Sequence, residues 1–267
     1  MSSGFNQWTG PSGLVYYDEA DVKWLFSFFR DTVGLSQNAL QGLFGNIYHE
    51  SFMCPFLGEG WENISRYSYE WQWNYCVNNV RTLTADQYAR QWYGASYYKG
   101  YSLAQWTTTD RKKQHYNYDA GGTKPSWKGL IGDMERDGNF LLLDLQTWDM
   151  RSSANESIWS AQHKTVWQWL SDPNVSISDA INAVLMIYER PFQDAAEAAR
   201  NYQAEYNSRE RYGRYVMQDL AGITPQPTPP TPGPPDPPPE PPTPGSLGLP
   251  IWLYFKMKEM NNNESIK

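Results

Sequence analysis

The apolar positions in the first part of the chain recur at the spacing of helices. In "YDEADVKWLFSFFRDTVG", Val22, Leu25 and Phe28 are three residues apart, and this spacing places them on one face of a helix. Acidic residues precede the apolar stripe and Gly34 follows it, as is typical of the start and the end of a helix. The pattern therefore predicts a helix over residues 17–34.

Ser36 begins a second predicted helix. A serine side chain can accept hydrogen bonds from the first backbone amides of a helix, which makes serine a preferred N-cap. The apolar face of this helix consists of Leu40, Leu43, Phe44 and Ile47. The stripe ends just before Glu50, so we expect this carboxyl group at the carboxyl end of the helix.

Three later stretches also have a helical pattern: residues 159–170, 177–190 and 192–212. Ser178 and Pro191 provide start and stop signals there. Residues 61–93 are aromatic and irregular, with one helical stretch at 84–93, and no part of the chain sustains the two-residue alternation of a strand. The predicted fold class is therefore α+β and mainly α, with at most a small β element.

Proline marks the main boundary along the chain. Residues 224–245 hold 13 of the 19 prolines, and a segment with few amide donors and a fixed φ forms an extended polyproline strut. The sequence therefore predicts four parts: an N-terminal extension (1–17), a folded domain (18–222), a proline-rich extended linker (223–245) and a short apolar and basic C-terminal peptide (246–267).

The charge and the aromatic content narrow the classes of partner. The net charge is −7 and no long run of Lys or Arg occurs, so we expect no nucleic-acid partner, because phosphate binding requires concentrated basic residues. No run approaches the roughly 20 apolar residues of a transmembrane helix. The 13 Trp and 19 Tyr residues exceed what a core of this size needs, and they either line a groove for sugars or pack inside.

Glu50 is the first candidate for chemistry. The carboxyl end of a helix carries partial negative charge, which favours the protonated form of a carboxyl group. Phe44, Phe52 and Met53 would add desolvation in the same direction. A carboxyl group that stays protonated near neutral pH can donate its proton to a leaving oxygen as a general acid. The alternative is a solvated glutamate at a helix end.

Two further stretches carry groups that suit a sugar. In "GYSLAQWTTTDR", the amide of Gln105 can donate and accept hydrogen bonds, and the indole of Trp106 can lie on a pyranose ring. In "VLMIYERPFQDAAEAARNY", Tyr188 ends an apolar helical stretch. We interpret Glu189 and Arg190, which follow it, as a structural ion pair.

Together these stretches resemble the phage tail lysozyme family. In that family a GN-x-x-x-ES-x-x-x-P stretch carries the catalytic glutamate, followed by a G-x-G-L-A-Q-W stretch, a YE-x-P stretch and a downstream arginine. The corresponding stretches here are "LFGNIYHESFMCP", "GYSLAQWTTTDRKK" and "AINAVLMIYERP…AAEAARNY", from about Asp18 to Tyr206. The ES and L-x-Q-W pair is also similar to signatures of goose-type lysozymes and soluble lytic transglycosylases.

The resemblance implies a lysozyme-like domain that cleaves the β-1,4 bond between N-acetylmuramic acid and N-acetylglucosamine in bacterial peptidoglycan. It would be a glycoside hydrolase of the muramidase type, with Glu50 as the catalytic general acid. The implied substrate-binding residues are Ser102, Gln105, Trp106 and Tyr188. The chain departs from the family pattern at Ser102 and Phe52, which stand where glycine is usual, and in the long aromatic insert 54–98.

The sequence does not single out a second catalytic carboxylate beside Glu50. Glycosidases usually pair two carboxylates, and Glu59, Glu62 and Glu70 lie in the aromatic insert without a spacing that singles one out. Relatives of the transglycosylase type use one glutamate and the N-acetyl group of the substrate, so hydrolysis and elimination to an anhydro sugar are both open. The remaining alternative is a non-catalytic glycan-binding or structural tail protein of the same fold.

Two other chemistries fit the sequence poorly. A zinc peptidase needs several ligands in a pattern such as HExxH, which His49, His115 and His163 do not form, so we expect no metal and no cofactor. A cysteine peptidase could combine Cys54 or Cys76 with His115, but neither cysteine lies at a clear helix N-terminus that would activate its thiol. Whether the two cysteines pair is open.

The first residues lack the pattern of a secretion signal, so we expect that an enzyme acting on the wall is delivered by other means, and the resemblance implies a phage. A free endolysin commonly carries a folded wall-binding module after its linker, whereas residues 246–267 are a short peptide. We therefore expect a lysin that is made in the host cytoplasm, carried on the phage tail and active at the bacterial cell wall. Leu247–Met257 would dock onto a tail protein. A free endolysin of the same fold is the alternative.

Overall fold

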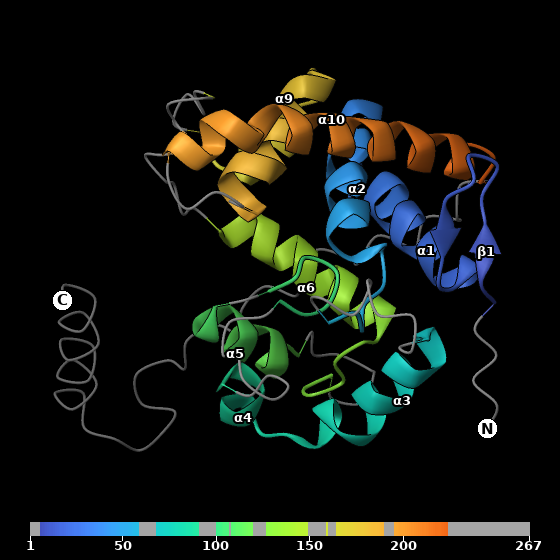
Figure 1. Cartoon of the computed structure of the whole chain (residues 1–267), viewed down its shortest axis with the longest axis vertical. Coiled ribbons are helices and arrows are strands. Elements are labelled where there is room, and N and C mark those ends of the chain that lie inside the picture. The colour runs from blue at the N-terminus through green and yellow to red at the C-terminus, as the bar shows by residue number, and fades with distance from the viewer. Residues whose placement is uncertain are drawn as a thin grey trace, which may run out of the picture. The chain divides into compact units, whose positions relative to one another are not determined.

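The computed structural model describes residues 6–58, 68–90, 100–106, 108–119, 127–148, 159, 164–189 and 195–223. Most of these residues are helical (Figure 1), and the mainly α fold class is confirmed. The proline-rich segment 224–245 and the C-terminal peptide lie outside the described residues. So do Glu59, Glu62, His163 and Arg190.

The first predicted helix is present and begins at Glu19, two residues later than the sequence pattern indicated. α1 spans Glu19–Ser27, and the side chain of Asp18 accepts hydrogen bonds from the backbone amides of Ala20 and Asp21. The chain then continues as a π-helical turn, η1 (Phe28–Thr32). The predicted helix over 17–34 is therefore present, although its last part is not a regular α-helix.

The second helix confirms both its predicted cap and its predicted apolar face. α2 spans Gln37–Ser51, and the side chain of Ser36 accepts a hydrogen bond from the amide of Ala39 at 3.3 Å. Leu40, Leu43, Phe44 and Ile47 are all buried. Glu50 is the penultimate residue of the helix, as the end of the stripe predicted.

Helix α10 (Ala195–Leu220) crosses α2 at close range (Figure 1). A Cβ added to Gly45 would lie 2.2 Å from the carbonyl oxygen of Arg209, and one added to Gly213 would lie 2.3 Å from that of Gln41. The two helices therefore pack backbone to backbone, and glycine is required at the crossing. This contact fixes the position of α10 relative to Glu50.

A short hairpin forms the small β element. β1 (Trp8–Thr9) pairs antiparallel with β2 (Val15–Tyr16). Trp8 stacks on Tyr16 at 4.9 Å between ring centroids, and Asp219 of α10 accepts hydrogen bonds from the Tyr16 hydroxyl and from the amide and hydroxyl of Ser12. Residues 6–17, expected as an extension, thus pack onto the domain itself.

The middle of the chain is more helical than the sequence predicted. α3 (Tyr69–Asn78) and the 3₁₀ turn η2 (Val80–Thr82) lie in the stretch expected to be irregular. α4 (Ala85–Arg90) lies within the helical stretch predicted at 84–93. That expectation was wrong for α3, where the side chain of Ser68 caps an aromatic-rich helix by accepting from the amide of Trp71.

Two helices that the periodicity did not indicate follow the aromatic insert: α5 (Thr109–Asn117) and α6 (Met134–Thr147). The helix expected over 159–170 is described only as α8 (Val166–Leu170). α6 was not predicted because several of its buried residues are polar, and these residues interrupt the apolar periodicity by which a helix is recognised in a sequence.

The last part of the domain contains α9 (Ile177–Asn182) and a π-helical turn, η4 (Ala183–Glu189). The cap of α9 is Ser176, whose side chain accepts from the amide of Asp179 at 3.0 Å, and not Ser178 as predicted. One hydrophobic core joins α1, α2, the turn at 101–106, α6 and η4. None of the helices among the described residues has the length and apolar character to cross a membrane.

Candidate functional site

The serine that follows Glu50 joins two of the sequence stretches singled out above. Ser51 Oγ lies 2.8 Å from the carbonyl oxygen of Leu103 and 3.0 Å from that of Ile47. Ser51 is fully buried. The end of α2 is therefore attached directly to the turn at 101–106.

A second contact fixes the same turn. The carbonyl oxygen of Leu57 accepts from the backbone amide of Ser102 at 3.0 Å and from Nε2 of Gln105 at 3.2 Å. Gly58 and Tyr101 form an isolated antiparallel bridge beside it. The segment after Glu50 and the "SLAQW" stretch consequently form one packed unit.

The two positions that depart from the family pattern both have left-handed backbone. Phe52 has a φ of 51° and Ser102 a φ of 71°; glycine adopts this region without the steric cost that a Cβ brings. Ser102 Oγ donates to Asp137 Oδ2 at 2.9 Å, and Phe52 packs edge-on against Tyr48. Each residue thus gains a side-chain contact that glycine cannot make.

Glu50 forms an ion pair with an arginine from the far end of the domain. Arg209 Nη2 donates to Glu50 Oε1. The Arg209 side chain is 1% exposed, whereas that of Glu50 is 21% exposed. The guanidinium is therefore buried behind a carboxylate that still reaches solvent.

The other side of Arg209 holds a second carboxylate. Arg209 Nη1 donates to Glu205 Oε2, one turn earlier on α10, and His49 Nε2 lies 3.2 Å from the same oxygen. Hydrogen bonds from His49 and Arg209 lower the pKa of Glu205 to about 2. Glu50 and Glu205 together place two negative charges on one buried guanidinium.

The surroundings of Glu50 differ in one respect from those that the sequence suggested. Besides the end of α2, a guanidinium from α10 contacts the carboxyl group directly.

Glu189 is a further carboxyl group close to this pair. It is the last residue of η4 and is partly exposed, but its Oε1 is buried and has no hydrogen-bond partner among the described residues. Burial raises the pKa of Glu189 well above its usual value, and the charge of Glu50 raises it further. The ion pair expected with Arg190 falls outside the described residues.

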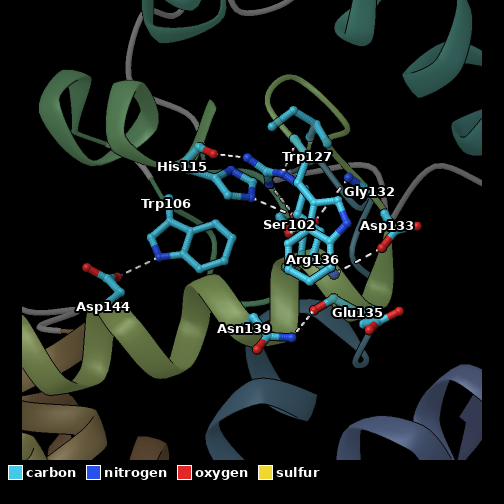
Figure 2. Close-up of polar contacts among 12 residues, drawn as sticks. Ser102, Trp106, His115, Trp127, Gly132, Asp133, Glu135, Arg136, Asn139 and Asp144 are labelled. Carbon is cyan, nitrogen blue, oxygen red and sulfur yellow. Dashed lines mark hydrogen bonds and ion pairs between the residues drawn. The ribbon is translucent and has the colours of Figure 1, made fainter. Parts of the chain in front are cut away.

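Asp144 of α6 binds one residue from the "GYSLAQW" stretch and one from the "VLMIYER" stretch. Its Oδ2 accepts from Trp106 Nε1 at 2.8 Å and from the Tyr188 hydroxyl at 2.7 Å. Arg111 also binds this oxygen, and its guanidinium lies 4.5 Å from the centre of the Tyr188 ring. Figure 2 shows the Trp106 indole pointing to Asp144.

Asp137, two turns earlier on α6, is the centre of a second buried network. It binds Ser102, the amide of Gly132, Arg136 and His115. Burial lowers the pKa of His115 to about 4, so the imidazole is neutral. Nε2 then donates to Asp137 Oδ1 at 2.9 Å, and Nδ1 accepts from the Tyr88 hydroxyl at 3.0 Å.

The five expected site residues thus lie at two depths. Glu50 reaches solvent, whereas Ser102 and Trp106 are 0% exposed and Tyr188 is 1% exposed. Gln105 is 9% exposed, and its Oε1 is buried with no partner among the described residues. The indole of Trp106 therefore has no exposed face for a sugar.

Sequence reasoning missed Arg209 and Glu189 as members of the site. Arg200 belongs to the quoted "AAEAARNY" stretch, but it is exposed on α10. Arg209 lies four residues before Gly213 and seven before Val216, both buried. A basic residue in register with the apolar face of a helix was the signal that could have identified it.

The buried thiols do not resemble an activated nucleophile. Cys54 and Cys76 are both free and buried. Burial raises the pKa of Cys54 well above its usual value and that of Cys76 to about 11. His115 is bonded to Asp137 and Tyr88 instead. Among the described residues, no group of three potential ligands could hold a metal ion.

Comparison with known proteins adds one finding. The family model described as phage tail lysozyme matches residues 20–218 of the chain, a range that contains Glu50, the turn at 101–106, Glu189 and Arg209. A search of curated proteins and a search of solved structures each found no match.

Proposed function

Because the chain belongs to the phage tail lysozyme family, we propose that it is a glycosidase that degrades bacterial peptidoglycan. The bond cleaved is the β-1,4 linkage between N-acetylmuramic acid and N-acetylglucosamine, and Glu50 donates the proton to the leaving oxygen. No cofactor or metal takes part.

The observation that carries this proposal is the position of Glu50. Its carboxyl group reaches solvent at the end of a buried helix, is held by the buried Arg209, and is followed by Ser51, which binds the Leu103 carbonyl oxygen at 2.8 Å. A group that protonates a leaving oxygen must be accessible and fixed in orientation. Glu50 meets both requirements.

Of the remaining candidate residues, one is proposed to contact the sugar and three are proposed to hold the turn at 101–106 in place. Gln105 is 9% exposed, and its Oε1 is buried without a partner among the described residues; a hydrogen bond from an N–H or O–H group of the sugar therefore requires this amide to turn outward. Ser102, Trp106 and Tyr188 are buried and act from beneath, through Asp137 and Asp144, by holding the turn that carries Gln105. Second-layer contacts of this kind preorganise a site.

Hydrolysis is the first candidate, and elimination of the lytic transglycosylase type is the second. Glu70, one of the carboxylates considered for a second role, is exposed in the first turn of α3. A single glutamate assisted by the N-acetyl group of the substrate would give a 1,6-anhydro sugar, whereas attack by water gives a reducing end. The two products differ by the mass of one water molecule.

We further propose that the protein is carried on the phage tail and acts at the host cell wall. The family description supports the tail. The peptide Leu247–Met257 docks onto a tail protein, and the proline-rich segment 224–245 holds the domain clear of it. Deletion of residues 246–267 is expected to leave activity on purified walls intact and to remove the protein from assembled particles.

Clearing of purified cell walls tests the catalytic part of the proposal. Glu50→Gln keeps the shape of the side chain but removes the proton, so the rate is expected to fall by roughly 10²–10⁴-fold. Glu210→Gln makes the same chemical change at an exposed position of α10 and serves as the matched control. Near wild-type clearing by Glu50→Gln would place the chemistry elsewhere.

Mass spectrometry of the released fragments tests the bond. Disaccharides with a reducing N-acetylmuramic acid support a muramidase, anhydro ends support a transglycosylase, and free stem peptides contradict both. Binding to walls without any released fragment would support a non-catalytic glycan-binding tail protein.

A further inference from the structure

The contact between Arg209 and Glu50 uses only one oxygen of the carboxyl group. Arg209 Nη2 donates to Glu50 Oε1. The other oxygen, Oε2, is neither buried nor hydrogen-bonded within the part of the chain that the structure describes. Arginine and carboxylate groups commonly pair through two parallel hydrogen bonds, so a contact through one oxygen has to be explained by the neighbours of the pair.

Two edges of the guanidinium could bind both oxygens of Glu50. The first edge, Nη1 with Nη2, is not available, because Nη1 donates to Glu205 Oε2. The second edge, Nε with Nη2, is not used, because Nε is buried and has no hydrogen-bond partner among the described residues. Buried donors are normally satisfied. The guanidinium of Arg209 is therefore held in an orientation that leaves one of its own donors unmatched.

Glu205 has the position that such an orientation requires. It precedes Arg209 by four residues on α10, a spacing that places the two side chains on one face of the helix. Arg209 Nη1 also donates to the backbone carbonyl oxygen of Glu205 at 3.4 Å. Hydrogen bonds from His49 and Arg209 lower the pKa of Glu205 to about 2, so its carboxylate is charged at neutral pH.

His49 holds Glu205 in place from the other helix. Its Nε2 lies 3.2 Å from Glu205 Oε2, the oxygen that also accepts from Arg209, and its Nδ1 lies 3.1 Å from Ser208 Oγ. His49 directly precedes Glu50 on α2. The contacts therefore run from Glu50 through Arg209 and Glu205 and return to the residue beside Glu50.

The helix backbones do not offer another way to change this geometry. A Cβ added to Gly45 of α2 would lie 2.2 Å from the carbonyl oxygen of Arg209, so the two backbones are already in contact. Arg209 can change its grip on Glu50 only by turning its guanidinium. The partner of Nη1 consequently decides how many oxygens of Glu50 the guanidinium binds.

We propose that Glu205 is a positioning residue that acts through Arg209: by occupying Nη1, it restricts the guanidinium to one oxygen of Glu50 and leaves Oε2 open to the glycosidic oxygen of the substrate. This inference rests on the proposed function, in which Glu50 donates a proton to that oxygen. Without Glu205, the guanidinium turns so that two of its donors bind both oxygens of Glu50, and the carboxyl group is closed to the substrate.

The kinetic constants on solubilised peptidoglycan test this restriction. In Glu205→Ala, kcat is expected to fall by roughly 10–100-fold, the range of a charge-assisted hydrogen bond placed on the reacting oxygen. KM is expected to stay unchanged within error, and a raised KM with an unchanged kcat would make Glu205 a substrate contact instead. Glu205→Gln keeps an acceptor for Nη1 and is expected to recover part of kcat. Glu210→Ala, at an exposed position of the same helix, is the matched control and is expected to leave both constants unchanged.

A double-mutant cycle separates this role from a merely structural one. Lysine carries a point charge and lacks the fork of a guanidinium. In the Arg209→Lys background, Glu205→Ala is therefore expected to have little further effect on kcat. The same factor of loss in both backgrounds would show that Glu205 does not act through the guanidinium, and would overturn the proposal.

Crystal structures test the geometry without an assay. In Glu205→Ala, both oxygens of Glu50 are expected within hydrogen-bond distance of the Arg209 guanidinium, and an Oε2 that stays free overturns the inference. If that variant does not fold, the wild-type crystal structure decides. A contact through one oxygen of Glu50, with Nη1 on Glu205, supports the inference, and a guanidinium that binds both oxygens of Glu50 while Glu205 is in place overturns it.

The outcomes also separate this inference from the function on which it rests. An inactive Glu50→Gln together with an unchanged kcat in Glu205→Ala contradicts the role of Glu205 and leaves the proposed function standing. An active Glu50→Gln contradicts the proposed function itself.

Discussion

Arg209 Nη2 donates a hydrogen bond to Glu50 Oε1 across 159 residues of sequence. The pair exists because α2 and α10 cross at two glycines, Gly45 and Gly213, so that the backbones approach directly. The carboxyl group that the sequence singles out is therefore oriented by a residue that belongs to none of the three quoted stretches.

Removal of the Arg209 charge is expected to reduce both stability and activity. Arg209→Gln leaves Glu50 and Glu205 without their common partner. Breaking a buried ion pair costs about 3–5 kcal/mol, but both carboxylates are partly exposed, so we expect a loss of about 2 kcal/mol in the free energy of unfolding. Urea denaturation measures this change.

Arg214→Gln provides the control for that experiment. Arg214 lies on the same helix but is exposed, so its replacement is expected to leave both the unfolding free energy and the wall-clearing rate within error. Equal effects of the two substitutions would show that Arg209 has no particular role.

The crossing of α2 and α10 can be tested with a single methyl group. Gly45→Ala places a Cβ 2.2 Å from the carbonyl oxygen of Arg209, and because that atom is backbone, the helices must separate. Overpacking of this kind costs about 1–3 kcal/mol, and wall clearing should fall as the Glu50–Arg209 pair loosens. Gly222→Ala is the control, since its Cβ meets nothing within 4 Å; a stable, active Gly45→Ala would contradict the close crossing.

The left-handed backbone at Ser102 predicts an order of stability among its variants. Ser102→Gly loses the hydrogen bond to Asp137 but also relieves the steric cost of a Cβ at a φ of 71°. Ser102→Ala loses the same hydrogen bond and keeps the cost. Ser102→Ala is therefore expected to be less stable than Ser102→Gly by about 1 kcal/mol, measured by thermal or urea denaturation; the reverse order would exclude backbone strain at this turn.

Acid is expected to destabilise the domain through His115. The folded pKa of about 4 lies below the usual 6.5, so between these values the unfolded chain binds a proton that the folded protein does not. Stability is then fully present above about pH 6.5 and is lost progressively as the pH falls toward 4, by about 3 kcal/mol in total. Urea denaturation at a series of pH values measures the slope.

Glu189 changes the stability with pH in the opposite direction to His115. The two contributions are separated by measuring the unfolding free energy of variants at each residue. The raised pKa of Glu189 gives stability that is present below the unfolded value of 4.5 and is lost as the pH rises. His115→Asn should remove the loss toward acid, and Glu189→Gln should make the rise toward neutral pH steeper. An unchanged slope in His115→Asn would show that the imidazole is not held neutral.

The sequence by itself determined the local features around the catalytic candidate. The Ser36 cap predicted where α2 begins, and the apolar stripe of α2 predicted that Glu50 lies at its end. These features depend on residues a few positions apart, for which helix geometry and capping suffice. The family was likewise readable from three short stretches in order.

The tertiary structure decided which groups act on Glu50 and how deep the aromatic residues lie. Trp106 resembled a sugar platform in the sequence, but Asp144 of α6 holds its indole inside the core. Arg209 and Glu189 became part of the site only through the crossing of α2 with α10 and the π-helical end of η4. Burial and charge pairing depend on residues far apart in the chain, which no local periodicity records.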